Sequence, residues 1–128
     1  MDDKKLSLAA CSGMSPYGLV ARAACSDTGE SSDKVISICM SATAADREGF
    51  RNLIRKYPII AVNGCEGLCV NKILQQKGVE VNTSINTLEF LNEQNLYPKN
   101  VSRLSEEDEK CVEALKKKIN TIVNKMSE

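Results

Sequence analysis

The chain has 128 residues, of which 42% are hydrophobic and 27% charged, and its 17 basic residues balance its 17 acidic ones. A chain of this length usually forms one domain and can bury roughly two-thirds of its unfolded surface. Balanced charge gives no field that attracts nucleic acid or an anionic membrane, and three tyrosines, two phenylalanines and no tryptophan make a base-stacking surface improbable. No apolar run approaches the length of a membrane span. We therefore expect one domain over residues 1–128, without nucleic-acid or membrane partners.

Cysteine dominates the residues that could bind a metal, because the chain has six cysteines and no histidine. Histidine is the usual general base and nitrogen ligand, so thiolates remain as the soft ligands. The apolar stretch before Cys11 is about five residues, shorter than the ~7–15 of a secretion signal, and it follows Asp2 and Asp3. We expect a cytoplasmic protein, where thiols stay reduced and grouped cysteines bind metal or do redox work.

Strands and helices are expected to alternate in the first part of the chain. Residues 5–10 are a short apolar strand candidate. Ser15 followed by Pro16 is a typical helix start, and the polar residues 26–33 are expected to form a surface loop after that helix. Residues 34–39 are expected to form a second strand, with Cys39 at its far end.

A second helix is expected before residue 58. Thr43 and Asp46 have the spacing of a capping box, which indicates a helix start at this point. The apolar side chains that follow recur at i, i+3, i+4 and i+7 and so share one helical face. They are Phe50, Leu53, Ile54 and Tyr57.

The most informative stretch for the candidate site predicts a buried strand over residues 58–62, followed by a glycine turn and a helix. Asn63 and Glu66 are expected to cap this helix. Cys65 then falls in its first turn, and Cys69 lies one turn further on the same face. A thiol at a helix N-terminus meets unpaired N–H groups and the positive end of the dipole, which favour its thiolate.

The last part of the chain should add an edge strand and two helices. Gly78 is expected to end the previous helix, and the alternation over residues 79–85 indicates a half-covered strand. A short helix over 87–94, a connector around 97–100 and a final helix over about 105–126 complete the domain, whose core spans about 5–100. The final helix has one apolar stripe that should pack on the domain or on a second copy of the chain. The stripe consists of Val112, Leu115, Ile119, Ile122 and Met126.

This alternation predicts a small three-layer α/β/α domain with a mostly parallel four-stranded sheet, Rossmann-like or flavodoxin-like in type. Cys11, Cys39 and Cys65 each follow a different strand. Because the carboxyl ends of parallel strands share one edge, these cysteines and Cys69 should converge there. Four thiolates suit a tetrahedral Zn²⁺ site, or they could hold an iron–sulfur cluster instead.

Three blocks of this sequence resemble the DGC-domain family of putative zinc-binding proteins. The first runs from Cys11 to Ser15 with Gly18 and Ala21, the second from Ile38 to Ser41, and the third from Val62 to Cys65 with Cys69. The resemblance covers roughly residues 5–85 and leaves the tail beyond about residue 100 outside. It implies a small prokaryotic α/β protein that binds zinc and has no settled reaction.

Carried over position by position, Cys11, Cys39, Cys65 and Cys69 match the family's cysteines, whereas Cys25 and Cys111 do not and are expected to lie in the core. Asn63 stands where the family usually has aspartate. Asparagine keeps the capping ability but loses a charge, so any role of that carboxylate in acid–base or supporting chemistry is open here.

Two other functions remain open from the sequence. In a thiol redox or sulfur-transfer enzyme, Cys65 would be the low-pKa nucleophile and a neighbouring cysteine would resolve it. A phosphocysteine or anion-binding loop at Cys11 would use backbone N–H groups, but it would leave the other three cysteines without a role. A phosphatase loop is excluded because Tyr17 stands where the phosphate-binding arginine would be required.

Overall fold

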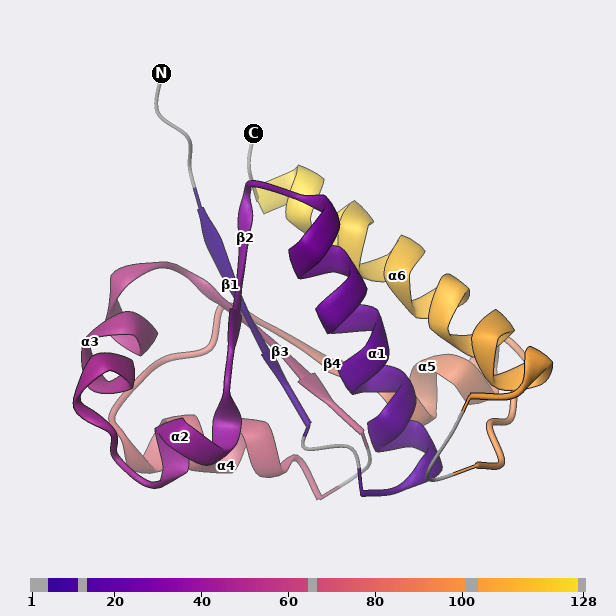
Figure 1. Cartoon of the computed structure of the whole chain (residues 1–128), viewed down its shortest axis with the longest axis horizontal. Helices are drawn as coiled ribbons and strands as arrows, with labels where there is room; N and C mark the ends of the chain where they lie inside the picture. Colours follow the sequence, from indigo (N-terminus) through magenta and orange to yellow (C-terminus); the bar gives the residue numbers. More distant parts are fainter. Residues whose placement is uncertain (1–4, 12–13, 65–66, 101–103, 127–128) are drawn as a thin grey trace.

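Four parallel strands form the centre of the molecule in this computed structural model, which describes residues 5–11, 14–64, 67–100 and 104–126 (Figure 1). The strands are β1 (Leu6–Ala10), β2 (Val35–Ile38), β3 (Ile59–Asn63) and β4 (Thr83–Asn86). They are arranged in the order β2-β1-β3-β4, and every neighbouring pair is parallel. The prediction of a small α/β domain with a four-stranded parallel sheet is confirmed.

Helices cover both faces of this sheet (Figure 1). They are α1 (Pro16–Ser31), α2 (Met40–Ala44), α3 (Glu48–Lys56), α4 (Cys69–Gln76), α5 (Thr87–Glu93) and α6 (Glu106–Met126). One face packs against α1, α5 and α6, and the other packs against α2, α3 and α4. The sheet therefore has an apolar layer on each side, which explains why β3 is buried along its whole length.

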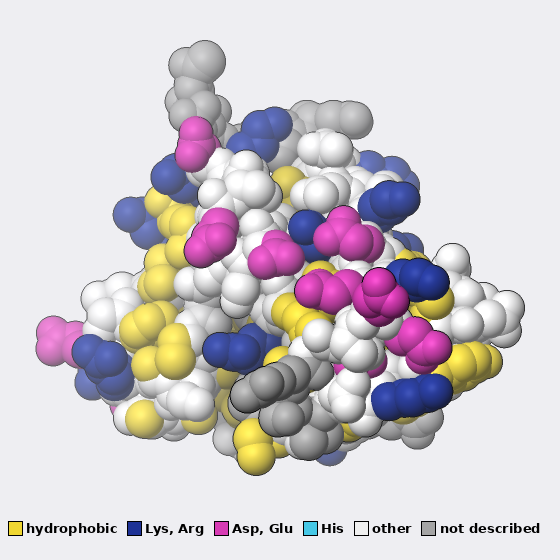
Figure 2. Space-filling view, turned by 45° about the vertical axis from the view of Figure 1, so that its right-hand side comes forward, with side chains coloured by type: hydrophobic (Ala, Val, Ile, Leu, Met, Phe, Trp, Pro, Cys, Tyr) yellow, Lys and Arg dark blue, Asp and Glu magenta, His cyan; other side chains and the backbone are white. Residues whose placement is uncertain are grey.

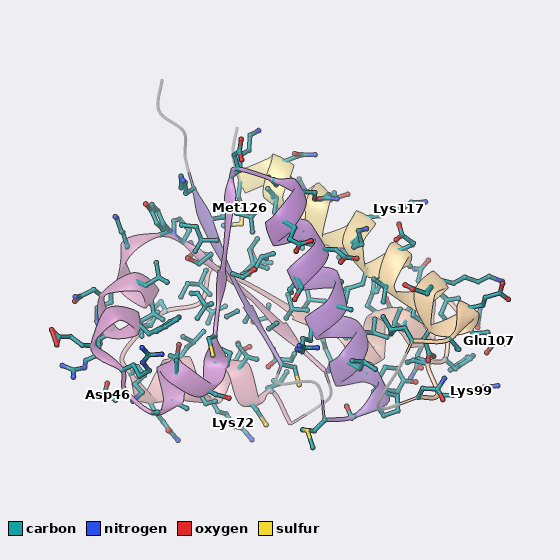
Figure 3. All side chains as sticks on the ribbon, viewed as in Figure 1. Asp46, Lys72, Lys99, Glu107, Lys117 and Met126 are labelled. Carbon is teal, nitrogen blue, oxygen red and sulfur yellow. The ribbon has the colours of Figure 1, made fainter. Side chains whose placement is uncertain are left out.

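Helix α6 lies along α1 and closes one side of the domain (Figure 1). Val112, Leu115 and Ile119 are fully buried in the core that α1 shares with β1. At the end of the stripe Met126 lies over the sheet, where the Thr83 hydroxyl is 3.7 Å from its sulfur (Figure 3). The apolar stripe of the final helix thus packs on its own domain. Within the described ranges, no helix combines the length and apolar content that a bilayer crossing requires.

Helix α1 is longer than its sequence indicated. It begins as predicted, with the Ser15 hydroxyl accepting a hydrogen bond from the Gly18 N–H at 2.9 Å and Pro16 in the first helical position. It continues to Ser31, however, so the expected loop over residues 26–33 is mostly helix. Thr28 explains the difference, because it is buried and its hydroxyl donates to the Ala24 carbonyl at 2.8 Å. Tertiary packing overrides a polar, turn-rich segment here.

The capping box predicted at Thr43 is also wrong. Thr43 lies inside α2, is buried, and donates its hydroxyl to the Cys39 carbonyl at 2.8 Å. A hydroxyl that bonds back to the preceding turn is the interior use of threonine, not the capping use. The chain then turns at Asp46, which has a φ of 64°, and α3 starts at Glu48. The expected edge strand over 79–85 is likewise shorter and lies at Thr83–Asn86.

The connector before α6 is held by one buried carboxylate. Asp108 accepts hydrogen bonds from the Lys99 N–H at 2.9 Å, the Asn100 side-chain amide at 2.8 Å and the Ser105 N–H at 3.2 Å. Burial by itself raises the pKa of Asp108, but these hydrogen bonds outweigh it and bring the pKa below the usual value. The nearby pair of Lys99 and Glu107, 3.6 Å apart, is exposed and contributes little by comparison (Figure 3).

Replacing Asp108 by alanine should lower the free energy of unfolding by about 2 kcal/mol at neutral pH, because the N–H groups of Lys99 and Ser105 and the Asn100 amide lose a charged acceptor. The folded-state pKa lies below the unfolded one, so this contribution is present at neutral pH and is lost as the pH falls below about 4. Urea unfolding of both proteins across this range measures the difference. A Glu107→Gln control should show no such pH dependence, and a constant Asp108→Ala deficit would contradict the assignment.

Candidate metal centre

Cys11 and Cys39 lie at the same edge of the sheet, where β1 and β2 end. Ala9 of β1 pairs with Ile38 of β2, so each cysteine comes just beyond the paired residues. The Cys11 N–H donates to the Val62 carbonyl of β3 at 3.0 Å, which also fixes this cysteine to the neighbouring strand. The prediction that parallel strands bring these two positions to one edge is confirmed for both cysteines.

The Cys11 sulfur lies beside the residue that directly precedes Cys65. A Cβ placed on Gly64 would lie 3.1 Å from the Cys11 sulfur, 2.7 Å from the Gly18 Cα and 2.9 Å from the Gly18 nitrogen. The end of β3, the first turn of α1 and Cys11 therefore meet in a space that only a glycine fits. Cys11 is half-buried and packs against the core on both sides of the sheet.

Cys39 is exposed and forms the N-cap of α2. Its sulfur accepts a hydrogen bond from the Ala42 N–H at 3.5 Å. Sequence reasoning placed Cys39 at a strand end but missed its role as a cap, because a thiol is not one of the usual capping groups.

Cys69 is the first residue of α4 and is exposed. The helix was expected to open near Cys65, and this prediction is wrong, since α4 begins at Cys69. Cys65 itself lies outside the described residues. Leu68, just before the helix, adopts the left-handed conformation with φ 51° and ψ 42°. Such a backbone costs a non-glycine residue roughly 1–2 kcal/mol, so the surrounding structure must hold the start of α4 in place.

A chain of hydrogen bonds from Asn63 holds the start of α4 in place. Asn63 is 1% exposed, and its side-chain oxygen Oδ1 accepts from the Val70 N–H at 3.1 Å, in the first turn of α4. The N-cap is Leu68 rather than the predicted Asn63, and Glu66 lies outside the described residues. The side-chain nitrogen Nδ2 of Asn63 donates to the side-chain oxygen Oδ1 of Asn71 at 2.6 Å. The side-chain nitrogen of Asn71 in turn donates to the Ser84 hydroxyl oxygen at 2.7 Å. The sequence indicated a bond from Asn63 to the following helix, but not the link from β3 through α4 to β4.

One pocket of about 350 Å³ contains both strand-end cysteines. We call it the rim pocket; its lining includes Cys11, Cys25 and Cys39 and parts of α1, β2 and α2. Cys25 is 2% exposed, and burial raises the pKa of its thiol to about 12. It therefore stays protonated at neutral pH and is a poor ligand, in agreement with its predicted core role.

Cys111 is buried at the α1–α6 contact, and burial is also the main cause that raises the pKa of its thiol. Burial thus distinguishes Cys25 and Cys111 from the other three described cysteines, which are exposed or half-buried. Within the described ranges, no three cysteine, aspartate or glutamate side chains form a group that could hold a metal ion. That set lacks Cys65, so the predicted group of four stays a prediction.

A comparison with known protein families identifies the family to which the chain belongs. The model of the DGC domain matches residues 7–124. The chain belongs to the DGC family. The match includes α6, so the DGC domain extends well beyond residue 85, where the resemblance of the three cysteine blocks ended. No curated protein and no solved structure gives a significant match to the chain.

Proposed function

We propose that this DGC domain is a cytoplasmic zinc-binding protein in which Cys11, Cys39, Cys65 and Cys69 hold the metal. The observation that carries the proposal is the shared location of Cys11 and Cys39 in the rim pocket, with the Cys11 sulfur beside Gly64. The next residue along the chain is Cys65, and the α4 start presents Cys69. Segments far apart in sequence thus bring thiols toward one edge of the sheet.

The residues fit a soft metal ion by their chemistry. Cysteine thiolates are preferred zinc ligands, and the described members of the set are exposed or half-buried. The Ala42 N–H at the Cys39 sulfur offsets part of the negative charge that such a set accumulates. With four thiolates a bound zinc ion would be structural or in transit, and with three it would offer a Lewis-acidic position to water or a sulfur compound.

Zinc content of the purified protein tests this proposal. Protein prepared without added metal should contain about one zinc ion per chain by elemental analysis, and it should be colourless. Replacing Cys39 by serine should reduce the bound zinc to a small fraction of this amount because a metal ligand is lost. Cys111→Ser is the matched control, since Cys111 is a core thiol, and it should keep the metal along with Cys25→Ser.

Other outcomes would identify the alternatives. Equal loss of metal in all three variants would overturn the ligand assignment. Iron, inorganic sulfide and a brown colour would show that the same residues bind an iron–sulfur cluster and not zinc. Metal-free protein with a reversible disulfide would favour the redox or sulfur-transfer enzyme instead.

A further inference from the structure

The rim pocket has a polar wall that the cysteine site does not explain. Arg22 and Ser26 contribute to it from α1, Ser37 from β2 and Ser41 from α2. All four are exposed, and none of these side chains forms a hydrogen bond or ion pair with another described residue. A guanidinium and three hydroxyls therefore face one small space with their hydrogen-bonding capacity unused.

The charge of the pocket has one sign among its described lining residues. Among the described residues that line the space, Arg22 is the only arginine or lysine, and none is an aspartate or glutamate. Some cations elsewhere are paired, such as Arg51 with Asp46 at 3.3 Å and Lys116 with Asp27 at 3.5 Å. On the face shown in Figure 2, basic and acidic side chains are likewise interspersed. An unpaired arginine beside hydroxyl donors is the arrangement that recognises a carboxylate or an oxyanion.

We propose that the rim pocket binds the anionic group of a small molecule, a carboxylate or a phosphate- or sulfate-like oxyanion, with Arg22 as its cationic partner. The volume of about 350 Å³ is at the lower end of the range for ligand pockets and suits a small molecule. An anion at Arg22 would bring the rest of its molecule toward Cys39 and Cys11. This inference deepens the proposed function, because it assigns the class of compound that the metal-binding cysteines would meet.

Charged and neutral alkylating reagents test the pocket on chelator-treated, metal-free protein. Iodoacetate and iodoacetamide react identically: the thiolate sulfur attacks the methylene carbon, a C–S bond forms, the C–I bond breaks, iodide leaves, and the thiol proton goes to solvent. Only iodoacetate has a carboxylate for Arg22. Cys39 and Cys69 are both exposed, but only Cys39 lines the rim pocket, so Cys69 is an internal control within the same molecule.

Peptide mass spectrometry measures the alkylation rate at each cysteine, and the quantity compared is the ratio of the iodoacetate rate to the iodoacetamide rate. We expect this ratio to be higher at Cys39 than at Cys69. We expect Arg22→Gln to lower the ratio roughly tenfold at Cys39 and to leave it unchanged at Cys69, because the variant removes about one charge-assisted hydrogen bond to the carboxylate. Arg22→Lys should retain part of the preference. Arg47→Gln, which removes an exposed arginine outside the pocket, should change nothing. Millimolar sulfate should protect Cys39 from iodoacetate and leave Cys69 unaffected.

Equal ratios at the two cysteines, or an Arg22→Gln variant with the wild-type ratio, would overturn the anion site. Zinc content of the same variants keeps this test separate from the proposed function. Arg22→Gln should bind zinc normally, because Arg22 is not a ligand. Normal zinc with no reagent preference refutes the anion site alone, whereas absent zinc with a preserved preference at Cys39 refutes the metal centre alone.

Discussion

Replacing Gly64 by alanine should lower the free energy of unfolding by about 3 kcal/mol, the upper range for overpacking a tightly packed site. The added Cβ would lie 2.7 Å and 2.9 Å from backbone atoms of Gly18 and 3.1 Å from the Cys11 sulfur. Backbone at this distance cannot move aside as a flexible side chain can, so β3 and α1 would have to separate. The same displacement would move Cys11 away from the chain that continues into Cys65, and bound metal should fall together with stability.

Urea unfolding and elemental analysis of the variant measure both effects. Gly49→Ala is the matched control, because Gly49 lies in the exposed part of α3 and an added Cβ there meets nothing within 4 Å. An alanine in a helix is favoured over glycine by roughly 0.5–1 kcal/mol, so this control should be slightly more stable than the wild type. If Gly64→Ala had wild-type stability and metal content, the close approach of α1 and β3 would be wrong.

Most of the fold could be predicted because its signals are local or periodic. Short apolar runs identified β1, β2 and β3, and parallel connectivity followed from the alternation of strands with helices. The predicted helix-start residues Ser15 and Ser105 hydrogen-bond the N–H groups of Gly18 and Asp108. These features need no knowledge of distant contacts, which is why single-sequence reasoning recovers them.

The errors occurred where a distant contact decides the local structure. Thr28 and Thr43 are polar residues that become buried in helices, and each satisfies its hydroxyl with a carbonyl of the preceding turn. The start of α4 was placed too early because Asn63 and Glu66 have the spacing of a local cap. In the structure, Asn63 reaches seven residues ahead to Val70, and a capping rule written for three residues cannot find that contact.

The candidate site likewise has residues that topology places and a residue that only tertiary packing places. Parallel topology was enough to bring Cys11 and Cys39 to one edge, because strand ends share that edge whatever the side chains do. Arg22 could not be found in this way. It lies in the middle of a helix with no motif around it, and only the packing of α1 against β2 shows that it lines the pocket of the two cysteines.

Two carboxylates at positions 63 and 71 should be far more destabilising than either alone. Asn63→Asp keeps an acceptor for the Val70 N–H, and the Asn71 amide can turn to donate to the new carboxylate while accepting from the Ser84 hydroxyl. Asn71→Asp can accept from both neighbours as it stands. Each single variant leaves the chain satisfied, so each should lose only about 1 kcal/mol or less.

The double variant Asn63→Asp/Asn71→Asp places two acceptors where the wild-type nitrogen and oxygen are 2.6 Å apart. At neutral pH it should lose about 3 kcal/mol or more beyond the sum of the single variants, because the two adjacent carboxylates repel each other and neither can donate a hydrogen bond to the other. Urea unfolding of the four proteins gives this coupling energy directly. Since Asn63 holds the start of α4, where Cys69 lies, bound zinc should fall in the double variant and remain in both single variants.

The pH dependence separates charge repulsion from a simple packing defect. Like charges in contact raise the pKa of one carboxyl above its unfolded value near 4, so a shared proton restores the hydrogen bond in acid. A raised folded-state pKa means that the penalty is absent below the unfolded pKa and grows as the pH rises through the folded one. The coupling energy should therefore shrink toward zero as the pH is lowered to about 4, whereas a steric defect would persist at every pH. Additive single variants at neutral pH would show that Asn63 and Asn71 do not form the link that positions Cys69.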